Sequence, residues 1–595
     1  MGNDRKASSG KPIRKRRRKK KKSGSCLILL IVFIIVAGCS GYVAWYLFMP
    51  SNDYEDFHTY YNLPPDEIAV VLRDVRLDLP DKPVEYNGSV CFPVDFVKNY
   101  IDPYIYWDEN IQKLTVTMPD KVLRFIPGQS GYYKNNKPAA ADAPVYMIDK
   151  KPYMPAELLT QVYHVSLGFH TDNNIVVLNY LGEDRETGAI ISENAALRFL
   201  PDKKAPLMYR FSNNEKIYVF GVEADYTRVR TENGLVGYVL TRQMTDTGPE
   251  KGIPEDVPAE FPALPTIQGK VNLVWDQVTR AEGNANSMGR TIEDGLDVIS
   301  PTWFSFDMNL SGDILSIADA DYVNWAHDHG CQVWALINDF SRDTDVVYNM
   351  EISQSILPDT DKRQHVIDQL MSLISEYNLD GVNIDFEWVQ RNDADAYVQF
   401  FRELYPYMRA AGKVLSVDVP APRADKYWPA YYNLAELGKS ADYVCVMAYD
   451  EYNASSKISG PCASMPYVRD GVEITLKDVP KEKVLMGLPY YTWVWKEETA
   501  DGAAAVTSCR SYDMDGAYRL FKDNNATITW DSAYGLNYAT FTDSEGAVYK
   551  TWLEDEQSVR EKLQYMRSMG LAGVAGWRWG LESSVVWDLL RQYVN

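Results

Sequence analysis

Cysteine and histidine are scarce in this chain. Its 595 residues include seven Cys and six His. No CxxC pair or His-rich cluster occurs, so we expect neither a metal site nor a cofactor. Cys331 and Cys445 lie in apolar, strand-like runs and are predicted core residues. Cys462 and Cys509 lie in loop-like stretches and could form a disulfide, a question that spacing alone leaves open.

Basic residues are in deficit over most of the chain. Residues 1–22 hold twelve of the 61 Lys and Arg, which leaves 49 basic against 81 acidic side chains and a net charge of −32 elsewhere. This acidic surplus excludes nucleic acid as a general partner. The basic block could by itself bind nucleic acid, but its place directly before an apolar segment favours a topology signal.

Charge is absent from residues 26–49, "CLILLIVFIIVAGCSGYVAWYLFM". The segment is long enough to span a bilayer. The positive-inside rule then predicts a single-pass protein of the cell membrane, with residues 1–25 as a cytoplasmic tail and the remainder outside. Alternatively, "VAGC" at Val36–Cys39 resembles a bacterial lipobox, which would be cleaved before Cys39 and lipidated. The apolar run continues past Cys39, which favours an uncleaved anchor.

Two small domains are predicted between the anchor and the C-terminal block. After a polar stalk at 50–66, residues 67–181 show a weak internal repeat in which a strand, a Pro (Pro93 and Pro155) and a short helix follow one another. This segment resembles the N-terminal domain of copper amine oxidases, and that name implies no copper site here. A spacer and a wall-binding module are both compatible with it.

A second small unit follows at 186–246, where short strands alternate with turn signals. It resembles a bacterial SH3 domain through "LRFLPD" at Leu197–Asp202 and "GLVGYV" at Gly234–Val239. Such a domain binds wall peptides or only packs. Residues 247–266 are rich in Pro and acidic residues and are predicted to be a linker.

The remaining residues, 267–595, alternate apolar strand-like runs with helical segments. This pattern predicts an α/β fold of the (β/α)8 TIM-barrel type, with an α+β insertion at about 496–560. The eight predicted strands are "KVNLVWDQV", "LDVISPTWFSF", "CQVWALINDF", "LDGVNIDFEW", "VLSVDVPAP", "ADYVCVMAYD", "VLMGLPYY" and "LAGVAGWRW".

The fourth predicted strand carries polar residues at every second position. Asn383, Asp385 and Glu387 alternate with apolar residues, so they should point into the barrel while the apolar ones face the helices. Buried carboxylates are costly unless they are paired or used. At the carboxyl end of a barrel strand they indicate catalysis.

These residues resemble a known family. "DGVNIDFE" at Asp380–Glu387 resembles the DxxDxDxE signature of family 18 glycoside hydrolases, and "MAYD" at Met447–Asp450, "GLPYY" and "GWRWG" resemble that family's later strand motifs. The two small domains in front make the chain more similar to the bacterial branch that includes spore cortex-lytic N-acetylglucosaminidases. The resemblance implies a retaining, substrate-assisted hydrolysis.

The resemblance also implies roles for individual residues. Glu387 would be the general acid and base, Asp385 would orient the N-acetyl group, and Tyr449 would donate to its oxygen. Asp450, Met447, Trp577 and Tyr491 would bind the sugar, with Trp577 as the floor of the site. Other aromatic residues are candidates to line the cleft or to fill the core: Trp303, Trp388, Tyr490, Trp493 and Trp579.

Two positions depart from the family pattern. Asn383 stands where an Asp is usual; it can hydrogen-bond Asp385 but cannot share a proton with it. "INDF" at Ile337–Phe340 lacks the SxGG pattern of many chitinases. The second departure weakens a plain chitinase assignment, and the resemblance to the cortex-lytic branch implies peptidoglycan, or another polysaccharide that contains N-acetylglucosamine, as the substrate. Chitin, the core of N-glycans, and a non-catalytic wall-binding barrel remain alternatives.

Overall fold

The computed structural model describes the chain except residues 1–23, 256–259, 340–349, 424–430, 501–502 and 595. The basic block at 1–22 therefore lies outside the described residues. The described residues within Met1–Val84 and His164–Glu255 form one compact unit, and those within Glu85–Tyr163 and Asp256–Asn595 form a second one.

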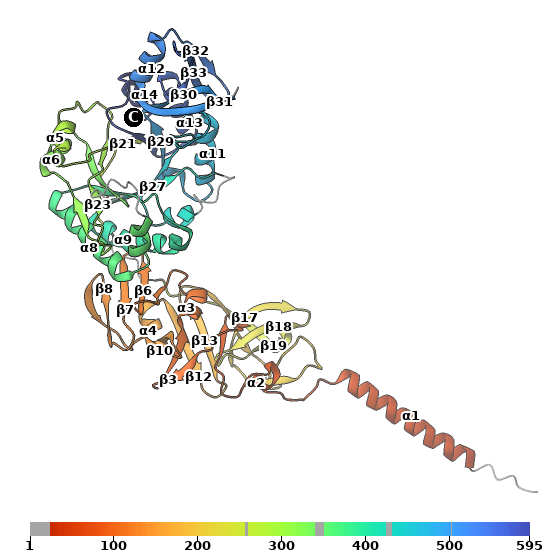
Figure 1. Cartoon of the computed structure of the whole chain (residues 1–595). Coiled ribbons are helices and arrows are strands. Elements are labelled where there is room, and N and C mark those ends of the chain that lie inside the picture. Colours follow the sequence, from red (N-terminus) through yellow and green to blue (C-terminus); the bar gives the residue numbers. More distant parts are fainter. Residues whose placement is uncertain (1–23, 256–259, 340–349, 424–430, 501–502, 595) are drawn as a thin grey trace, which may run out of the picture. The chain divides into compact units, whose positions relative to one another are not determined.

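One long apolar helix, α1 (Gly24–Phe48), begins the described chain (Figure 1). Its segment Leu27–Phe48 has 22 residues and is long and apolar enough to cross a membrane. As a helix it satisfies its backbone hydrogen bonds internally. It contains no charged residue, so its surface suits lipid. A signal sequence passes the same test of length and composition.

Two sheets in the first unit share one hydrophobic core, which includes Val71, Ile175 and Val229. A seven-stranded antiparallel sheet has the order β16-β15-β19-β18-β17-β14-β20, and a four-stranded sheet has the order β12-β13-β1-β2. Gly234, with φ +88°, leaves room for Ile175 and Val177 of the smaller sheet. The elements are α2 (Phe57–Tyr61), β1 (Ala69–Leu72), β2 (Val75–Arg76), β12 (Val165–His170), β13 (Ile175–Tyr180), β14 (Arg185–Ile190), β15 (Ala196–Arg198), β16 (Leu207–Arg210), β17 (Lys216–Glu223), β18 (Tyr226–Thr231), β19 (Val236–Leu240), η1 (Thr241–Gln243) and β20 (Met244–Glu250).

The expected repeat of strand, Pro and helix is present. Pro93 and Pro155 each end a strand and stand at the N-cap of a short helix, where their missing N–H removes no helical bond. The two strands pair antiparallel, with Tyr153 opposite Pro93. The elements of this region are β3 (Val84–Tyr86), β4 (Ser89–Pro93), α3 (Val94–Tyr100), β5 (Tyr106–Asp108), β6 (Lys113–Met118), β7 (Lys121–Phe125), β8 (Gly131–Lys134), β9 (Lys137–Ala140), β10 (Tyr146–Ile148), β11 (Lys151–Pro155) and α4 (Ala156–Val162).

Eight parallel strands close the predicted barrel. Each pairs with its neighbours, and the ring closes where the first strand pairs with the last, Val271 opposite Gly573, and where the second pairs with the third, Val298 opposite Gln332. The barrel strands are β21 (Val271–Asp276), β22 (Val298–Pro301), β25 (Gln332–Asn338), β26 (Gly381–Asp385), β27 (Val414–Pro420), β28 (Tyr443–Met447), β29 (Val484–Pro489) and β35 (Gly573–Trp577).

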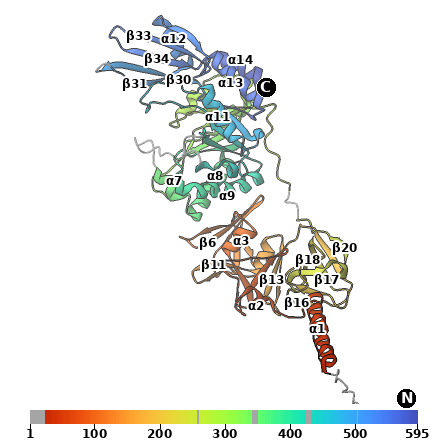
Figure 2. The ribbon, with the colours of Figure 1, turned by 90° about the vertical axis from the view of Figure 1, so that its right-hand side faces the viewer.

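Helices surround the strands (Figures 1 and 2). The longest are α8 (Thr360–Tyr377), which leads into β26, and α9 (Ala394–Ala411), which follows it. Asp359 caps α8 by accepting from the N–H groups of Asp361 and Lys362. The others are α5 (Gly283–Met288), α6 (Ala320–Asp328), α7 (Met350–Ile356), η2 (Arg391–Asp393), α10 (Leu434–Leu437), α11 (Met465–Thr475), η4 (Lys481–Lys483), α13 (Glu556–Met569) and α14 (Val585–Tyr593).

The second predicted strand, "LDVISPTWFSF", is two strands rather than one. A turn, in which the N–H of Trp303 donates to the oxygen of Pro301 at 2.8 Å, separates β22 from β23 (Phe304–Phe306). β23 then pairs antiparallel with β24 (Ile314–Ser316). Because Pro301 has no N–H for the ladder, the strand breaks there.

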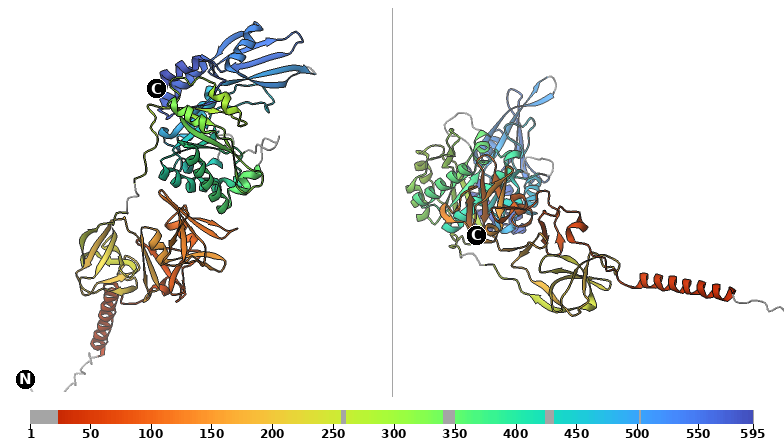
Figure 3. Two further views of the ribbon diagram at one scale, coloured as in Figure 1. Left: turned by 90° about the vertical axis from the view of Figure 1, so that its left-hand side faces the viewer. Right: turned by 90° about the horizontal axis from the view of Figure 1, so that it is seen from below.

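An α+β insertion lies between β29 and β35. Its five-stranded sheet has the order β31-β30-β34-β33-β32, and α12 (Met514–Asp523) packs on it through a small core that includes Val494, Phe521 and Ala539. Figures 2 and 3 show this sheet projecting from the barrel. Its strands are β30 (Tyr491–Ala500), β31 (Ala503–Asp513), β32 (Thr527–Asp531), β33 (Leu536–Thr542) and β34 (Val548–Leu553).

Candidate active site

Successive side chains along β26 point alternately outward, towards the helices, and inward, into the barrel, as expected. Phe386, just past the strand, packs outward against Phe306 and Phe400, with ring centroids 5.6 and 5.9 Å away. Asn383 points inward, where it meets Trp275 of β21 across the barrel. Asp385 ends the strand and is 7% exposed. The inward residues thus form the floor of a site at the carboxyl ends of the strands.

The backbone that carries Glu387 is held by a buried carboxylate. Asp339, which follows β25, accepts from the N–H of Glu387 at 3.1 Å and of Trp388 at 3.0 Å. Ser353 of α7 donates to the same carboxylate at 3.0 Å. Glu387 itself is only partly buried. The backbone at Glu387 is therefore fixed, while the residue stays partly exposed.

The carboxyl groups at this site have raised pKa values. Burial raises the pKa of Glu387 to about 7, and the charges of Asp339, Asp418 and Asp450 act in the same direction. Burial also raises the pKa of Asp385 well above its usual value, with the charges of Glu387, Asp418 and Asp339 adding to the effect. At neutral pH the cluster therefore retains protons, and Glu387 can act as an acid.

Asn383 does not hold Asp385, which corrects the expected hydrogen bond. Its amide nitrogen donates to Ser416 Oγ at 2.9 Å and to Asp418 Oδ1 at 2.8 Å. Its oxygen accepts from Trp275 Nε1 at 3.1 Å. Oδ1 of Asp385 is buried without a hydrogen-bond partner among the residues the structure describes. Asn383 thus belongs to a network beneath the reacting groups.

Tyr449 and Asp450 follow β28 on the same side of the barrel. The Tyr449 ring lies edge-on to Trp275 and to Tyr491, with centroids 6.4 and 6.5 Å away. Asp450 has φ +57° and accepts from the hydroxyl of Tyr491 and from Trp493 Nε1, the latter at 2.9 Å. The left-handed backbone turns Asp450 towards these aromatic residues, so its carboxylate has a fixed direction.

Trp577 ends β35, and its ring lies 6.1 Å from that of Trp275. Met447 ends β28 and packs partly buried against the barrel core. The structure therefore brings all eight predicted site residues to strands, or segments just after strands, at one end of the barrel: Asn383, Asp385, Glu387, Met447, Tyr449, Asp450, Tyr491 and Trp577.

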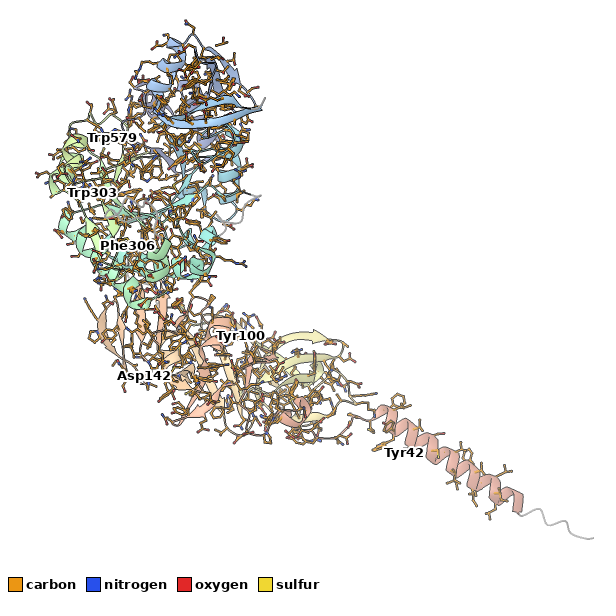
Figure 4. The ribbon with its side chains drawn as sticks, viewed as in Figure 1. Tyr42, Tyr100, Asp142, Trp303, Phe306 and Trp579 are labelled. Carbon is orange, nitrogen blue, oxygen red and sulfur yellow. The ribbon has the colours of Figure 1, made fainter. Side chains whose placement is uncertain are left out.

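The wider set of aromatic candidates divides. Trp303, Tyr490 and Trp579 are at most 2% exposed and fill the core; Trp303 and Trp579 are labelled in Figure 4. Trp493 is partly exposed beside Asp450.

The candidate cysteine pair does not form a disulfide. Cys462 and Cys509 are free thiols, and Cys462 Sγ lies 3.8 Å from Asp450 Oδ1. Cys331 and Cys445 are buried, as expected.

Three residues of the site were not predicted from the motifs: Trp275, Asp339 and Asp418. Each is the aromatic or acidic residue at or just past the carboxyl end of a barrel strand, in "NLVWD", "LINDF" and "LSVDVP". The rule applied to the fourth strand would have found them if it had been applied to the first, third and fifth.

Comparisons with known proteins agree with this geometry. Residues 351–582 match the sequence profile described as glycosyl hydrolases family 18, and residues 71–178 match that of the copper amine oxidase N-terminal domain. The barrel of this chain is a family 18 glycosyl hydrolase domain, preceded by a copper amine oxidase N-terminal-like domain. Both resemblances are thereby confirmed, whereas the SH3-like identity of 186–246 stays a prediction.

Similar proteins occur in Bacillus species. The protein YdhD of Bacillus subtilis is 29% identical over 232 residues, which are 39% of this chain and 54% of YdhD. The cortical fragment-lytic enzyme of Bacillus subtilis is 25% identical over 252 residues, 42% of this chain and 57% of that enzyme. The chain thus spans little more than half the length of these relatives. The crystal structure of the Bacillus cereus spore cortex-lytic enzyme SleL is 19% identical, covers 56% of this chain and 76% of its own, and has a TM-score of 0.49.

Proposed function

We propose that this protein is a membrane-tethered, extracytoplasmic enzyme that hydrolyses β-1,4 linkages after N-acetylglucosamine in peptidoglycan. The observation that carries the proposal is Glu387, a partly exposed carboxyl group whose pKa is raised to about 7 beside the buried Asp385. An acid near neutral pKa and a second carboxylate at one end of a barrel are the parts that a retaining glycosidase needs.

Glu387 supplies the proton. Its carboxyl group protonates the glycosidic oxygen as the bond from that oxygen to the anomeric carbon breaks. The carbonyl oxygen of the substrate's own N-acetyl group attacks the anomeric carbon from the opposite face and forms a cyclic oxazolinium ion. Water then attacks that carbon from the face that the leaving group has left and gives a proton to the Glu387 carboxylate, while the bond between the anomeric carbon and the acetamido oxygen breaks. The configuration is therefore retained, and the N-acetyl group and the acid are both restored.

Asp385 orients the attacking group. Its Oδ1 atom is buried and lacks a hydrogen-bond partner among the described residues, so it can accept the N–H of the acetamido group. As that N–H bond polarises, negative charge on Asp385 stabilises the oxazolinium cation. Tyr449, which follows β28, donates a hydrogen bond from its hydroxyl to the acetamido oxygen.

The remaining residues hold the sugar. Asp450 is already fixed by Tyr491 and Trp493 through Oδ1, which leaves Oδ2 for a sugar hydroxyl. Trp577, with Met447 nearby, offers an aromatic floor to the sugar C–H groups and to the developing cation.

Peptidoglycan is favoured as the substrate by location and by relatives. A chain held by α1 at the membrane surface reaches the wall that surrounds the cell, and one relative is named for lysis of cortical fragments. The net charge of −32 outside the basic block gives no long-range attraction to anionic wall polymers. Recognition therefore rests on short-range contacts in the cleft.

The test uses the full chain in detergent micelles, with Glu387→Gln and, as a matched control, Glu376→Gln on the exposed face of α8. Each protein digests peptidoglycan, spore cortex and chitin oligomers, and mass spectrometry identifies the new reducing ends. N-Acetylglucosamine ends from peptidoglycan, lost in Glu387→Gln and kept in the control, are expected. Products from chitin alone would identify chitin as the substrate. Binding to the wall without any products would identify the barrel as a non-catalytic, lectin-like domain.

A further inference from the structure

Position 383 poses a question that the family pattern leaves open. The usual Asp would place a second carboxylate beneath Asp385, and this chain has an amide there. The structure shows a carboxylate one strand further along. Asp418 of β27 lies 2.8 Å from the Asn383 amide nitrogen through Oδ1. β26 and β27 are parallel neighbours, with Asn383 opposite Ser416, so Asp418 lies one inward-facing step above Ser416.

Asp418 is buried and strongly held. It is 2% exposed, and its Oδ2 atom accepts from Trp275 Nε1 at 3.0 Å. Trp275 and Asn383 thus direct one N–H each at different oxygens of the same carboxylate. Burial raises the pKa of Asp418 to about 7, and these two donors act in the opposite direction because they favour the charged form.

The other ionisable groups that interact with Asp418 come from both neighbouring strands and from α9. They are Asp385 and Glu387 from β26 and its end, Cys445 and Tyr449 from β28 and its end, and Tyr397 of α9. Two further carboxyl groups, Asp339 and Asp450, act on Glu387 in the same direction as Asp418. Like charges this close cannot all be ionised at neutral pH.

We propose that Asp418 is the positioning carboxylate of this site: from β27 it supplies the negative charge that the family pattern places at position 383, and it thereby keeps Asp385 and Glu387 protonated in the resting enzyme. The proposal rests on the glycosidase function proposed above. Asn383 is then the group that holds Asp418 in place, since its amide bridges Asp418, Ser416 and Trp275.

This arrangement distributes the charge in a defined way. Asp418 has two N–H donors, whereas Asp385 Oδ1 has no partner among the described residues, so before substrate binds the charge lies on Asp418 and the proton on Asp385. The acetamido N–H of a bound substrate then donates to Asp385 and favours its charged form. The Asp418 charge also contributes to the raised pKa of Glu387. The general acid of the site therefore depends on a buried carboxylate of the neighbouring strand.

The experiment compares three variants of the full chain with the wild type. Asp418→Asn removes the charge and keeps the shape. Asn383→Asp/Asp418→Asn exchanges amide and carboxylate, so Trp275 and the amide now at position 418 can both donate to the carboxylate now at position 383. Asp442→Asn is the matched control. Asp442 is also a hydrogen-bonded carboxylate; it is partly buried and accepts from Leu415 N at 2.9 Å and from the Tyr405 hydroxyl at 3.1 Å, but it lies at the opposite end of the strands.

The first readout is thermal unfolding from pH 5 to 9, which needs no activity. Carboxyl groups with raised pKa values make the wild type less stable as pH rises, because the folded state holds protons that the unfolded state releases. Asp418→Asn should flatten this decline, the exchange variant should restore it, and Asp442→Asn should leave most of the decline in place. A wild-type slope in Asp418→Asn would overturn the proposal.

The second readout is the pH dependence of kcat/KM on the substrate found above. Without the Asp418 charge, the pKa of Glu387 falls, so the alkaline limb should move down by about one pH unit in Asp418→Asn. The exchange variant should move it back. A uniform loss of rate with an unmoved limb would show that Asp418 only supports the fold. If the wild type hydrolyses no substrate, the proposed function fails, and the unfolding data alone decide the role of Asp418.

Discussion

At the scale of the residue, the site depends on which carboxyl groups keep their protons. Glu387 is partly exposed, and its backbone N–H is held by Asp339. Asp385 is buried, and its Oδ1 atom can still accept a hydrogen bond. Because burial raises both pKa values, the chemistry of the site depends on its solvation as much as on its residue types.

We expect the alkaline limb of kcat/KM to lie near pH 7, because Glu387 must be protonated to act as the acid and its pKa is about 7. Initial rates from pH 4 to 9 check this. Glu387→Gln should lose about 10³-fold in kcat at every pH. A rate that stays constant up to pH 9 would remove Glu387 from the role of acid.

Trp577→Ala should lower kcat/KM by about tenfold, since the contact of one aromatic ring contributes about 1–1.5 kcal/mol. Steady-state kinetics on a defined oligosaccharide measure the loss. Trp530→Ala, on β32 of the insertion sheet, is the matched control and should leave kcat/KM unchanged. Equal losses in both variants would assign the effect to stability instead of sugar contact.

At the scale of the element, the catalytic strand lies between two braced helices. Glu403 of α9 is fully buried and binds Arg363 of α8 at 2.8 Å and Arg124 of β7 at 3.1 Å. Two guanidinium groups therefore share one carboxylate, and the Arg363 guanidinium also lies 4.7 Å over the ring of Tyr106. The sheet of β5 to β9 thus holds the helices before and after β26 in one cluster.

Glu403→Gln should lower the free energy of unfolding of this unit by about 3–5 kcal/mol, because it leaves two buried guanidinium groups without a charge partner. Denaturant unfolding followed by tryptophan fluorescence measures the change. Glu376→Gln, which is exposed on the same helix pair, is the control. A change of less than about 1 kcal/mol would show that the cluster does not brace the helices.

The sequence predicted a barrel strand correctly where the pattern of polar and apolar residues within that strand was sufficient. The alternation in "LDGVNIDFEW" identified β26 and the direction of Asp385, because period 2 needs no knowledge of neighbours. It could not predict the partners of Asn383. Trp275 and Asp418 are 108 and 35 residues away, and only the register of the closed barrel brings them together. The break between β22 and β23 has a signal in the sequence, because Pro301 lacks an N–H, but the apolar run around Pro301 favours a single strand.

At the scale of the whole molecule, the membrane attachment proposed for this chain can be tested through α1. A spanning α1 predicts that the full-length protein stays in the membrane fraction after alkaline carbonate extraction. Its mass should be that of the uncleaved chain, and Cys39→Ala should change neither result. Loss of the first 38 residues and a lipid adduct on Cys39 would instead establish the lipoprotein alternative. Removal of residues 1–49 should release the protein in either case.

The closure of the barrel has a consequence for export. β35 pairs with β21 on one side and with β29 on the other, so both of those strands keep an open edge until residues 573–577 are available. About 300 residues separate the two sides of this seam, and contacts of such long range form slowly. If the chain crosses the membrane after α1, as proposed above, two unpaired edges stay exposed until residues 573–577 have passed. Proteases outside the membrane should accordingly recognise chains in which β35 has not paired with β21 and β29. Variants truncated before residue 573 should therefore be degraded and not merely inactive.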